Sequence, residues 1–294
     1  MTTEDELEKY RGIIVGRFAQ LAGSRFSMMA QGWHSKAVEV DGRLVFKFPV
    51  NAVAEEALRR EAALLAVIRP AVTICVPQLT LHEGPPLFSR HEKIEGEHLV
   101  GAQYETLPQD ARQDLAERLA LFYAELHALN AGVMKAAGAR PVEPWLEPQA
   151  VLERALPVLP PDLGAYGEET VRAWRNLPPD PHGETYGFFD GHGWNMAFDH
   201  RKRRLNGIYD FADSGFGPLH QEFVYSNFIS PDLTARIVSR YETITGRTLD
   251  RRRIDILTGA HRLSELAALA DDPAHAPAMV RHVADWVAAR KALD

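Results

Sequence analysis

The hydrophobic pattern of this chain changes its period about one third of the way along, and this change constrains the fold more than any other feature. Before it, apolar and polar residues alternate as in strands, for example at 36–48, with one helical stretch at 51–68. After it, apolar residues recur mainly at helical spacing, as at 108–129. We therefore predict an α+β fold with two lobes. The N-terminal lobe, over residues 1–95, is rich in β-strands and begins with a helix, and the C-terminal lobe, over residues 96–294, is mainly helical.

The composition is that of an ordinary globular protein, with 46% hydrophobic and 25% charged residues. The 33 Lys and Arg against 40 Asp and Glu give a net charge of −7, which argues against a nucleic-acid partner and is compatible with a cationic one. The N-terminus lacks the features of a signal peptide, and no uncharged apolar run reaches the roughly 18 residues of a membrane span. We expect a cytoplasmic protein without a membrane partner. The single cysteine, Cys75, is expected to be a small buried residue.

The helix predicted after the hairpin carries a carboxylate within its apolar stripe. Glu61 follows Ala54 and Leu58 and precedes Leu65 and Ile68 at spacings that put all five side chains on one face. A carboxylate on that face loses hydration, so it needs a cation or several hydrogen-bond donors. The alternative is that Glu61 lies at the edge of the stripe and reaches solvent.

The hairpin at 36–48 supplies a candidate cation. Strand alternation puts Val45 and Lys47 on the same face of the sheet. If this face lies over a nucleotide, Val45 covers the base while Lys47, held by Glu61, reaches phosphate oxygens. A solvated edge position is the commoner situation for a strand lysine, so this alternative stays open.

A third group of polar residues lies further along the chain. Residues 195–198 and 205–209 are expected to pair as antiparallel strands, which places Asn195 beside Asp210. Oxygen ligands of this kind suit Mg²⁺, which completes its shell with water and phosphate oxygens. Asp190, in the preceding loop, is placed to orient and deprotonate an attacking hydroxyl. Each residue alone is a common turn residue, but the ordered set indicates phosphoryl transfer in the protein-kinase arrangement.

In this order the motifs resemble those of the aminoglycoside phosphotransferase family, small-molecule kinases that share the bilobal protein-kinase fold. The resemblance implies transfer of the γ-phosphate of ATP or GTP to a hydroxyl of a small polar molecule, with Mg²⁺ as cofactor. It extends over roughly residues 25–225 and rests on VFKFP at 45–49, RREAALL at 59–65, EKIEGEHL at 92–99, AELHAL at 124–129, DGHGWN at 190–195 and IYDFADSGFGP at 208–218.

The resemblance assigns roles to the polar residues. It implies that Lys47 contacts the α and β phosphates and is held by Glu61. It implies that Asp190 is the catalytic aspartate and that Asn195 and Asp210 bind the metal.

The resemblance also implies where the nucleotide is bound. The backbone of Glu92 and Ile94, in the linker between the lobes, is expected to hydrogen-bond the purine, and Val45 is expected to cover it. The segment AQGWHSKA corresponds to the phosphate loop, so that Gly32 and Ser35 are candidate phosphate-binding residues.

Two departures from the family pattern leave alternatives open. Phe188 and Phe189 stand where the family usually has a histidine and a small residue before the catalytic aspartate, and the acidic positions that follow Asp210 are changed. A nucleotide-binding pseudokinase with impaired catalysis is therefore an alternative to an active enzyme. A helical interaction protein that uses its C-terminal helices is another.

The sequence leaves the acceptor open. Aminoglycosides are polycations and would favour an acidic site, for which Asp213, Glu222 and Glu265 are candidates. The alternative is that most of these acids are solvated helix or turn residues. A choline, homoserine, sugar or macrolide acceptor is equally compatible with the family resemblance, because a fold does not specify its substrate.

Overall fold

The computed structural model describes residues 3–29 and 35–291, which form two compact units. Unit 1 contains the chain up to residue 98 together with 128–139 and 195–212. Unit 2 contains the remaining segments, at 99–127, 140–194 and from 213 onward. The predicted α+β class is confirmed, with an antiparallel sheet near the N-terminus and a mainly helical remainder. Residues 128–139 and 195–212 are therefore part of unit 1 although they follow residue 95 in the sequence.

The centre of unit 1 is a five-stranded antiparallel sheet with the strand order β1-β2-β3-β5-β4. The predicted hairpin is confirmed, because β2 and β3 pair antiparallel through a turn in which Asp41 and Gly42 adopt φ angles of 54° and 68°. The strands are β1 Phe26–Met28, β2 Ser35–Val40, β3 Leu44–Pro49, β4 Thr80–His82 and β5 Phe88–Glu92.

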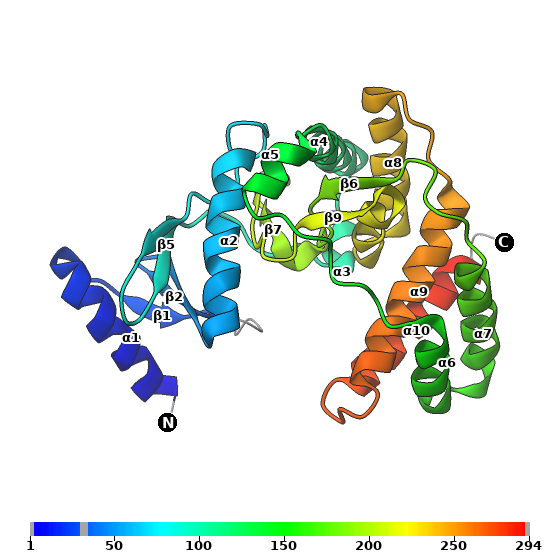
Figure 1. The fold of residues 1–294 in the computed structure, drawn as a ribbon, viewed down its shortest axis with the longest axis horizontal. Coiled ribbons are helices and arrows are strands. Elements are labelled where there is room, and N and C mark those ends of the chain that lie inside the picture. The colour runs from blue at the N-terminus through cyan, green and yellow to red at the C-terminus, as the bar shows by residue number, and fades with distance from the viewer. Residues whose placement is uncertain (1–2, 30–34, 292–294) are drawn as a thin grey trace. The chain divides into compact units, whose positions relative to one another are not determined.

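Two helices lie on opposite sides of this sheet (Figure 1). Helix α1, Thr3–Arg17, packs Tyr10 and Ile14 in one hydrophobic cluster with Phe46 and Phe48 of β3. The other face of β3 carries Lys47, which contacts helix α2, Ala52–Ile68. Asn51 caps α2 by accepting a hydrogen bond from the Ala54 amide at 2.9 Å, which explains why the helix begins there. As the strand alternation in the sequence predicts, Phe46 and Phe48 lie on the face of β3 that packs in the core, and Lys47 lies on the other face.

The remainder of unit 1 is formed by short elements. Helix α5 spans Ala131–Ala136, and strands β7, Met196–Asp199, and β8, Arg204–Ile208, form a hairpin. The prediction that Cys75 is buried is wrong, because Cys75 is exposed. A Cβ atom on Gly207 would lie 2.5 Å from the Cys75 carbonyl oxygen, so the backbone of Cys75 packs against β8 while its side chain reaches solvent.

Unit 2 is mainly helical and contains one two-stranded sheet. Helices α6, α7, α9 and α10 lie beside one another (Figure 1). Its elements are α3 Gly101–Tyr104, α4 Gln109–His127, α6 Pro148–Ala155, η2 Leu156–Val158, α7 Pro161–Arg175, β6 Glu184–Gly187, β9 Gly215–Pro218, η4 Leu219–Phe223, η5 Tyr225–Phe228, α8 Pro231–Thr245, α9 Arg251–Leu269 and α10 Ala276–Lys291.

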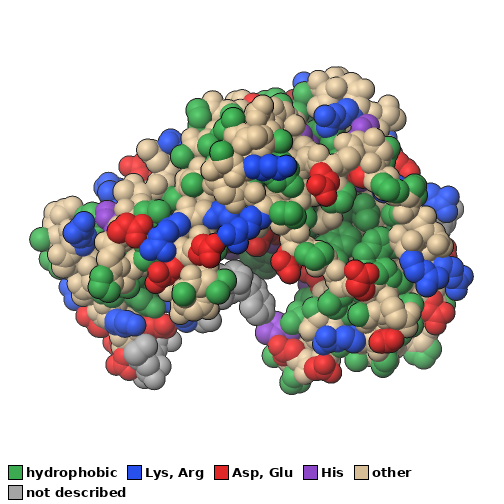
Figure 2. Space-filling view, in the orientation of Figure 1, with side chains coloured by type: hydrophobic (Ala, Val, Ile, Leu, Met, Phe, Trp, Pro, Cys, Tyr) green, Lys and Arg blue, Asp and Glu red, His purple; other side chains and the backbone are tan. Residues whose placement is uncertain are grey.

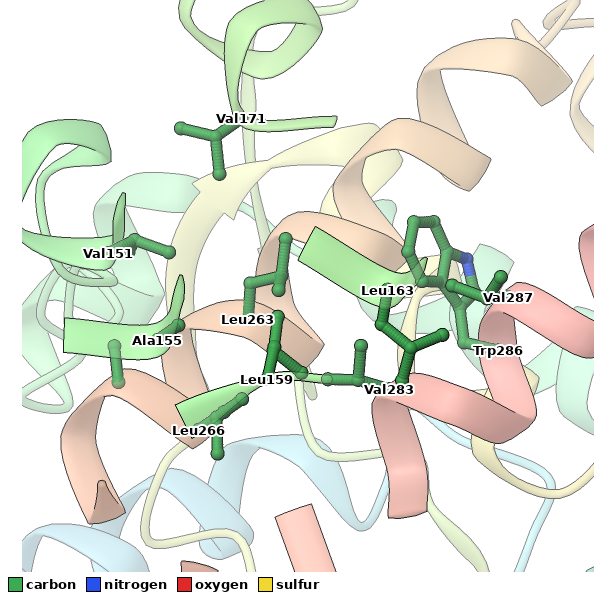
Figure 3. Close-up of a cluster of buried hydrophobic side chains, with 11 residues drawn as sticks. Val151, Ala155, Leu159, Leu163, Val171, Leu263, Leu266, Val283, Trp286 and Val287 are labelled. Carbon is green, nitrogen blue, oxygen red and sulfur yellow. The ribbon is translucent and has the colours of Figure 1, made fainter. Parts of the chain in front are cut away.

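The four helices of this group enclose a hydrophobic core (Figure 3). Leu263 of α9 lies in it, together with Leu163 of α7 and Val283 of α10. On the outside, acidic and basic side chains are intermixed over the face drawn in Figure 2. None of the described helices has the length and apolar character of a membrane span.

Replacing Leu263 with Ala is expected to lower the free energy of unfolding by about 2–5 kcal/mol, because the buried side chain leaves a cavity among three helices. Leu121→Ala is the matched control, since Leu121 is an exposed residue of helix α4. Urea unfolding followed by circular dichroism measures both variants. Equal stability of the two variants would contradict the described core.

Candidate active site

In unit 1, a lysine ammonium lies between two carboxylates from distant parts of the chain. The Nζ atom of Lys47 is 3.5 Å from Oε1 of Glu61 and 3.1 Å from Oδ1 of Asp210. Glu61 is only 2% exposed, and its Oε1 also accepts a hydrogen bond from the Phe211 amide at 3.0 Å. The interrupted apolar stripe of α2 thus has the cation and the donor that its burial requires.

The two carboxylates stabilise the charge of Lys47 but oppose the ionisation of each other. Burial lowers the pKa of Lys47, but the charges of Glu61 and Asp210 outweigh burial and raise that pKa above its ordinary value. Burial, together with the charge of Asp210, raises the pKa of Glu61 above its ordinary value, although the charge of Lys47 opposes this change. We conclude that Lys47 is a permanent cation at a fixed position, suited to binding an anion such as a phosphate group.

The β7–β8 hairpin brings Asn195 next to the residues that precede Asp210. Met196 pairs with Ile208, and the Tyr209 amide donates to the Asn195 carbonyl oxygen at 3.1 Å. Asp210 has a positive φ of 69°, and its side chain is 49% exposed. The carboxylate is therefore held beside Lys47 while part of it still faces solvent.

Asn195 and Asp210 are suitable ligands for a magnesium ion that is shared with a phosphate-bearing ligand. One amide and one carboxylate are too few to hold a metal alone, and among the described residues no group of three or more His, Cys, Asp or Glu side chains could do so. Mg²⁺ is commonly bound by one or two protein carboxylates together with water and phosphate oxygens, which matches this donor set.

The residues that the resemblance assigned to base and phosphate binding lie along the same sheet. Val45 is buried on the face of β3 that carries Lys47, and Glu92 ends β5 opposite Leu44. Ile94 packs against Gly207, where an added Cβ would lie 2.8 Å from its Cγ2 atom. Ser35 opens β2 opposite Pro49. Gly32 lies outside the described residues.

In unit 2, a buried carboxylate holds the backbone directly before Asp190. Glu222 is 0% exposed, and its oxygens accept hydrogen bonds from the amides of Phe188 at 2.8 Å and Phe189 at 3.0 Å. Its Oε2 atom also lies 3.3 Å from Nε2 of His127. Glu222, which the sequence offered as a substrate ligand, is thus engaged inside the protein.

The loop that carries Asp190 is held close to its surroundings by two glycines. A Cβ on Gly191 would lie 2.1 Å from the Tyr123 hydroxyl, and a Cβ on Gly193 would lie 1.7 Å from the Leu99 carbonyl oxygen. The Leu99 amide also donates to the Gly193 carbonyl at 3.1 Å. These approaches exclude side chains at both positions and fix the course of the loop.

Within this loop, His192 contacts Asp190 directly. Nε2 of His192 is 2.9 Å from Oδ1 of Asp190. Sequence reasoning missed His192 and also His127 and Tyr123 as neighbours of this loop. His127 and His192 were both present in the motifs AELHAL and DGHGWN, but the motifs alone did not show what these side chains contact.

The other two acidic substrate candidates differ in their surroundings. Asp213 is exposed. Oε2 of Glu265 is 3.4 Å from both Nδ1 of His261 and Nη1 of Arg262. Burial raises the pKa of Glu265, but the neighbouring His261 and Arg262 lower it below its ordinary value. The negative charge of Glu265 is therefore largely balanced within unit 2.

Comparison with known proteins identifies the family and the fold. The profile of the phosphotransferase enzyme family matches residues 29–257. Similar solved structures include the GDP complex of a mutant of aminoglycoside 2'-phosphotransferase-IIIa, with a TM-score of 0.84, 21% identity and coverage of 96% of this chain and 97% of that chain. The GDP and kanamycin complex of APH(2")-IIIa has a TM-score of 0.78, 21% identity and coverage of 95% and 98%.

A third similar structure is named for a macrolide rather than an aminoglycoside. It is the macrolide 2'-phosphotransferase MphH from Brachybacterium faecium, with a TM-score of 0.65, 17% identity and coverage of 94% of this chain and 97% of that chain. No match was found among curated proteins. The family resemblance read from the sequence and the kinase-like fold that it implied are confirmed.

Replacing Glu222 with Ala is expected to destabilise the protein by on the order of 3 kcal/mol, because two amides and His127 lose a buried acceptor. Glu168→Ala, at an exposed position of helix α7, is the control. Thermal unfolding distinguishes them, and a Glu222→Ala protein as stable as the control would refute the anchoring role.

His91 is expected to stay neutral throughout the physiological pH range. Burial, followed by the charge of Lys47, lowers the pKa of His91 to about 3. The unfolded chain binds this proton near pH 6.5, so protonation favours unfolding as the pH falls below about 6.5. NMR should show no titration of the His91 ring between pH 8 and pH 5, and His91→Phe should reduce the loss of stability in acid. A His91 ring that titrates near pH 6.5 would contradict this.

Proposed function

Because the chain belongs to the phosphotransferase enzyme family, we propose that it transfers the γ-phosphate of ATP or GTP to a hydroxyl group of a small polar molecule. The Lys47 ammonium, held between Glu61 and Asp210, is the observation that most strongly supports this proposal. Asp190 supports it from unit 2, on a loop with fixed backbone contacts. Asp190 and Asn195 are five positions apart, so one continuous segment carries the residues for acceptor and metal.

The residues of unit 1 are proposed to bind the nucleotide. Lys47 neutralises phosphate oxygens as a point charge, and Glu61 keeps it in place. Asn195 and Asp210 would hold Mg²⁺, which when bound neutralises charge on the phosphate oxygens. Since the transition state of phosphoryl transfer is loose, fixed positive charge and alignment account for most of the catalysis.

The remaining nucleotide contacts follow from the family resemblance. The backbone at Glu92 and Ile94 is proposed to hydrogen-bond the purine beneath Val45. Ser35 and Gly32 are proposed to lie near the phosphates. We further propose that the strand-rich segment over residues 1–95 and the helical segment over 96–294 act as nucleotide and substrate lobes.

Asp190 is proposed to receive the proton of the acceptor. As the acceptor oxygen forms a bond to the γ-phosphorus, the bond from this phosphorus to the bridging oxygen breaks and the nucleoside diphosphate leaves. The hydroxyl proton passes to the Asp190 carboxylate, which lies at the surface of its loop with 21% exposure. We propose that this reaction takes place in the cytoplasm, where nucleoside triphosphates are abundant.

An aminoglycoside is the first candidate acceptor, with Asp213 and Glu265 as candidate contacts for its amino groups. Choline, homoserine, sugar and macrolide acceptors are the alternatives.

Asp190→Ala is expected to lower kcat by about 100- to 10,000-fold while the nucleotide dissociation constant changes little. Lys47→Ala should instead weaken nucleotide binding. Transfer from radiolabelled ATP or GTP to a panel of aminoglycosides, macrolides and hydroxylated metabolites measures turnover, and isothermal titration calorimetry measures binding.

Asp162→Ala, at an exposed position of helix α7, is the control for this experiment. Unchanged turnover by Asp190→Ala would exclude the assignment of the catalytic aspartate. Nucleotide binding without transfer to any acceptor by the wild-type protein would instead favour the pseudokinase alternative.

A further inference from the structure

We propose that His192 is a positioning residue for phosphoryl transfer, which holds one oxygen of the Asp190 carboxylate so that the other oxygen receives the acceptor hydroxyl. This inference rests on the proposed function of Asp190. The contact that carries it is the 2.9 Å distance between Nε2 of His192 and Oδ1 of Asp190.

The loop gives the two side chains little freedom to separate. The His192 amide donates to the Asp190 carbonyl oxygen at 2.9 Å, which closes a tight turn. Gly191 and Gly193 on either side of His192 are packed against Tyr123 and Leu99, as described above. Because the backbone is fixed at both flanking residues, the imidazole approaches the carboxylate from a defined direction.

The ring of His192 is suited to donating to Asp190. Its Nδ1 atom is buried and has no hydrogen-bond partner among the residues that the structure describes. A neutral ring therefore satisfies more of its hydrogen-bonding capacity with its proton on Nε2, where Asp190 accepts it. Phe188 and Phe189, which precede Asp190, have no polar group in their side chains, whereas His192 places an N–H donor at Oδ1 of Asp190.

The charged groups around His192 favour its protonated form. Burial lowers the pKa of His192, but the hydrogen bond and charge of Asp190 and the charge of Glu265 on α9 outweigh burial and raise that pKa above its ordinary value. Helix α4 contributes the hydroxyl of Tyr123. Burial and the charges of Glu222 and Asp190 raise the pKa of this hydroxyl, so it stays neutral. His192 donates to Asp190 in both of its protonation states, but only the imidazolium form reduces the proton affinity of Asp190 through its charge.

This contact has a direct consequence for the reaction. The contact of Oδ1 with His192 restricts rotation of the Asp190 carboxylate about its Cβ–Cγ bond, so both oxygens keep a constant direction. Displacement of a reacting group by about 1 Å can cost on the order of 100-fold in rate, which sets the size of the expected effect. Nucleotide binding involves other residues and should not depend on His192.

His192→Leu is expected to lower kcat by about 10- to 100-fold, while the acceptor KM and the nucleotide dissociation constant stay within about threefold of the wild-type values. His192→Gln keeps an N–H donor without a charge and should restore kcat to within a few-fold of the wild type. His275→Leu is the matched control, because Nδ1 of His275 lies 2.7 Å from Asp272 in an exposed pair on the same unit.

The pH profile separates positioning from a merely structural role. In the wild type, kcat is expected to rise as the pH increases and His192 loses its proton, because Asp190 then accepts the hydroxyl proton more readily. His192→Gln should lack this rise. The same inflection in His192→Gln, or a His192→Leu protein with the activity of the His275→Leu control, would overturn the inference.

The proposed function can be tested separately in the same assays. If Asp190→Ala abolishes transfer but His192→Leu does not reduce it, only the positioning role is wrong. If Asp190→Ala retains full transfer, the function assigned to Asp190 is wrong. Nucleotide binding measured on each variant shows whether the protein is folded, so that a loss of activity through unfolding is recognised.

Discussion

The buried carboxylate of Glu61 is the constraint on which the arrangement of unit 1 depends. An ionised group in an apolar stripe is stable only when a cation and hydrogen-bond donors replace its lost hydration. Lys47 on β3 supplies the cation, and the Phe211 amide, 150 residues away in the sequence, supplies a donor. The cation and the donor that Glu61 requires therefore bring a strand, a helix and the segment after the β7–β8 hairpin together. The same contacts hold the Lys47 ammonium beside Asp210.

Burial divides the acidic residues of the site into two kinds. Glu61 and Glu222 are almost completely buried and use their oxygens to hold a lysine, backbone amides and a histidine. Asp210 and Asp190 stay partly exposed, each next to a cationic or hydrogen-bonding partner. The buried acids therefore fix the positions of groups, whereas the partly exposed acids face solvent with part of their carboxylates. The same residue type serves both purposes because the surroundings differ.

Sequence periodicity was sufficient for contacts within regular elements. Helical spacing placed Glu61 on the core face, strand alternation separated Lys47 from the core, and hairpin pairing placed Asn195 near Asp210. Periodicity did not predict the contacts of Glu222, because Glu222 binds backbone amides of a loop, which leave no pattern in the sequence. The prediction that Cys75 is buried was wrong for a related reason. Its apolar neighbours suggested burial, but its backbone packs closely against Gly207 while its side chain is exposed.

The identity of the reaction product distinguishes phosphoryl transfer to an acceptor from hydrolysis of the nucleotide. Phosphorus NMR of the wild-type protein with ATP or GTP, Mg²⁺ and a panel of hydroxylated acceptors follows donor and product in one sample. We expect a new phosphomonoester signal that grows at the rate at which nucleoside diphosphate appears, with one acceptor in the panel. Release of inorganic phosphate alone, with no phosphorylated acceptor, would contradict the proposed phosphotransferase activity.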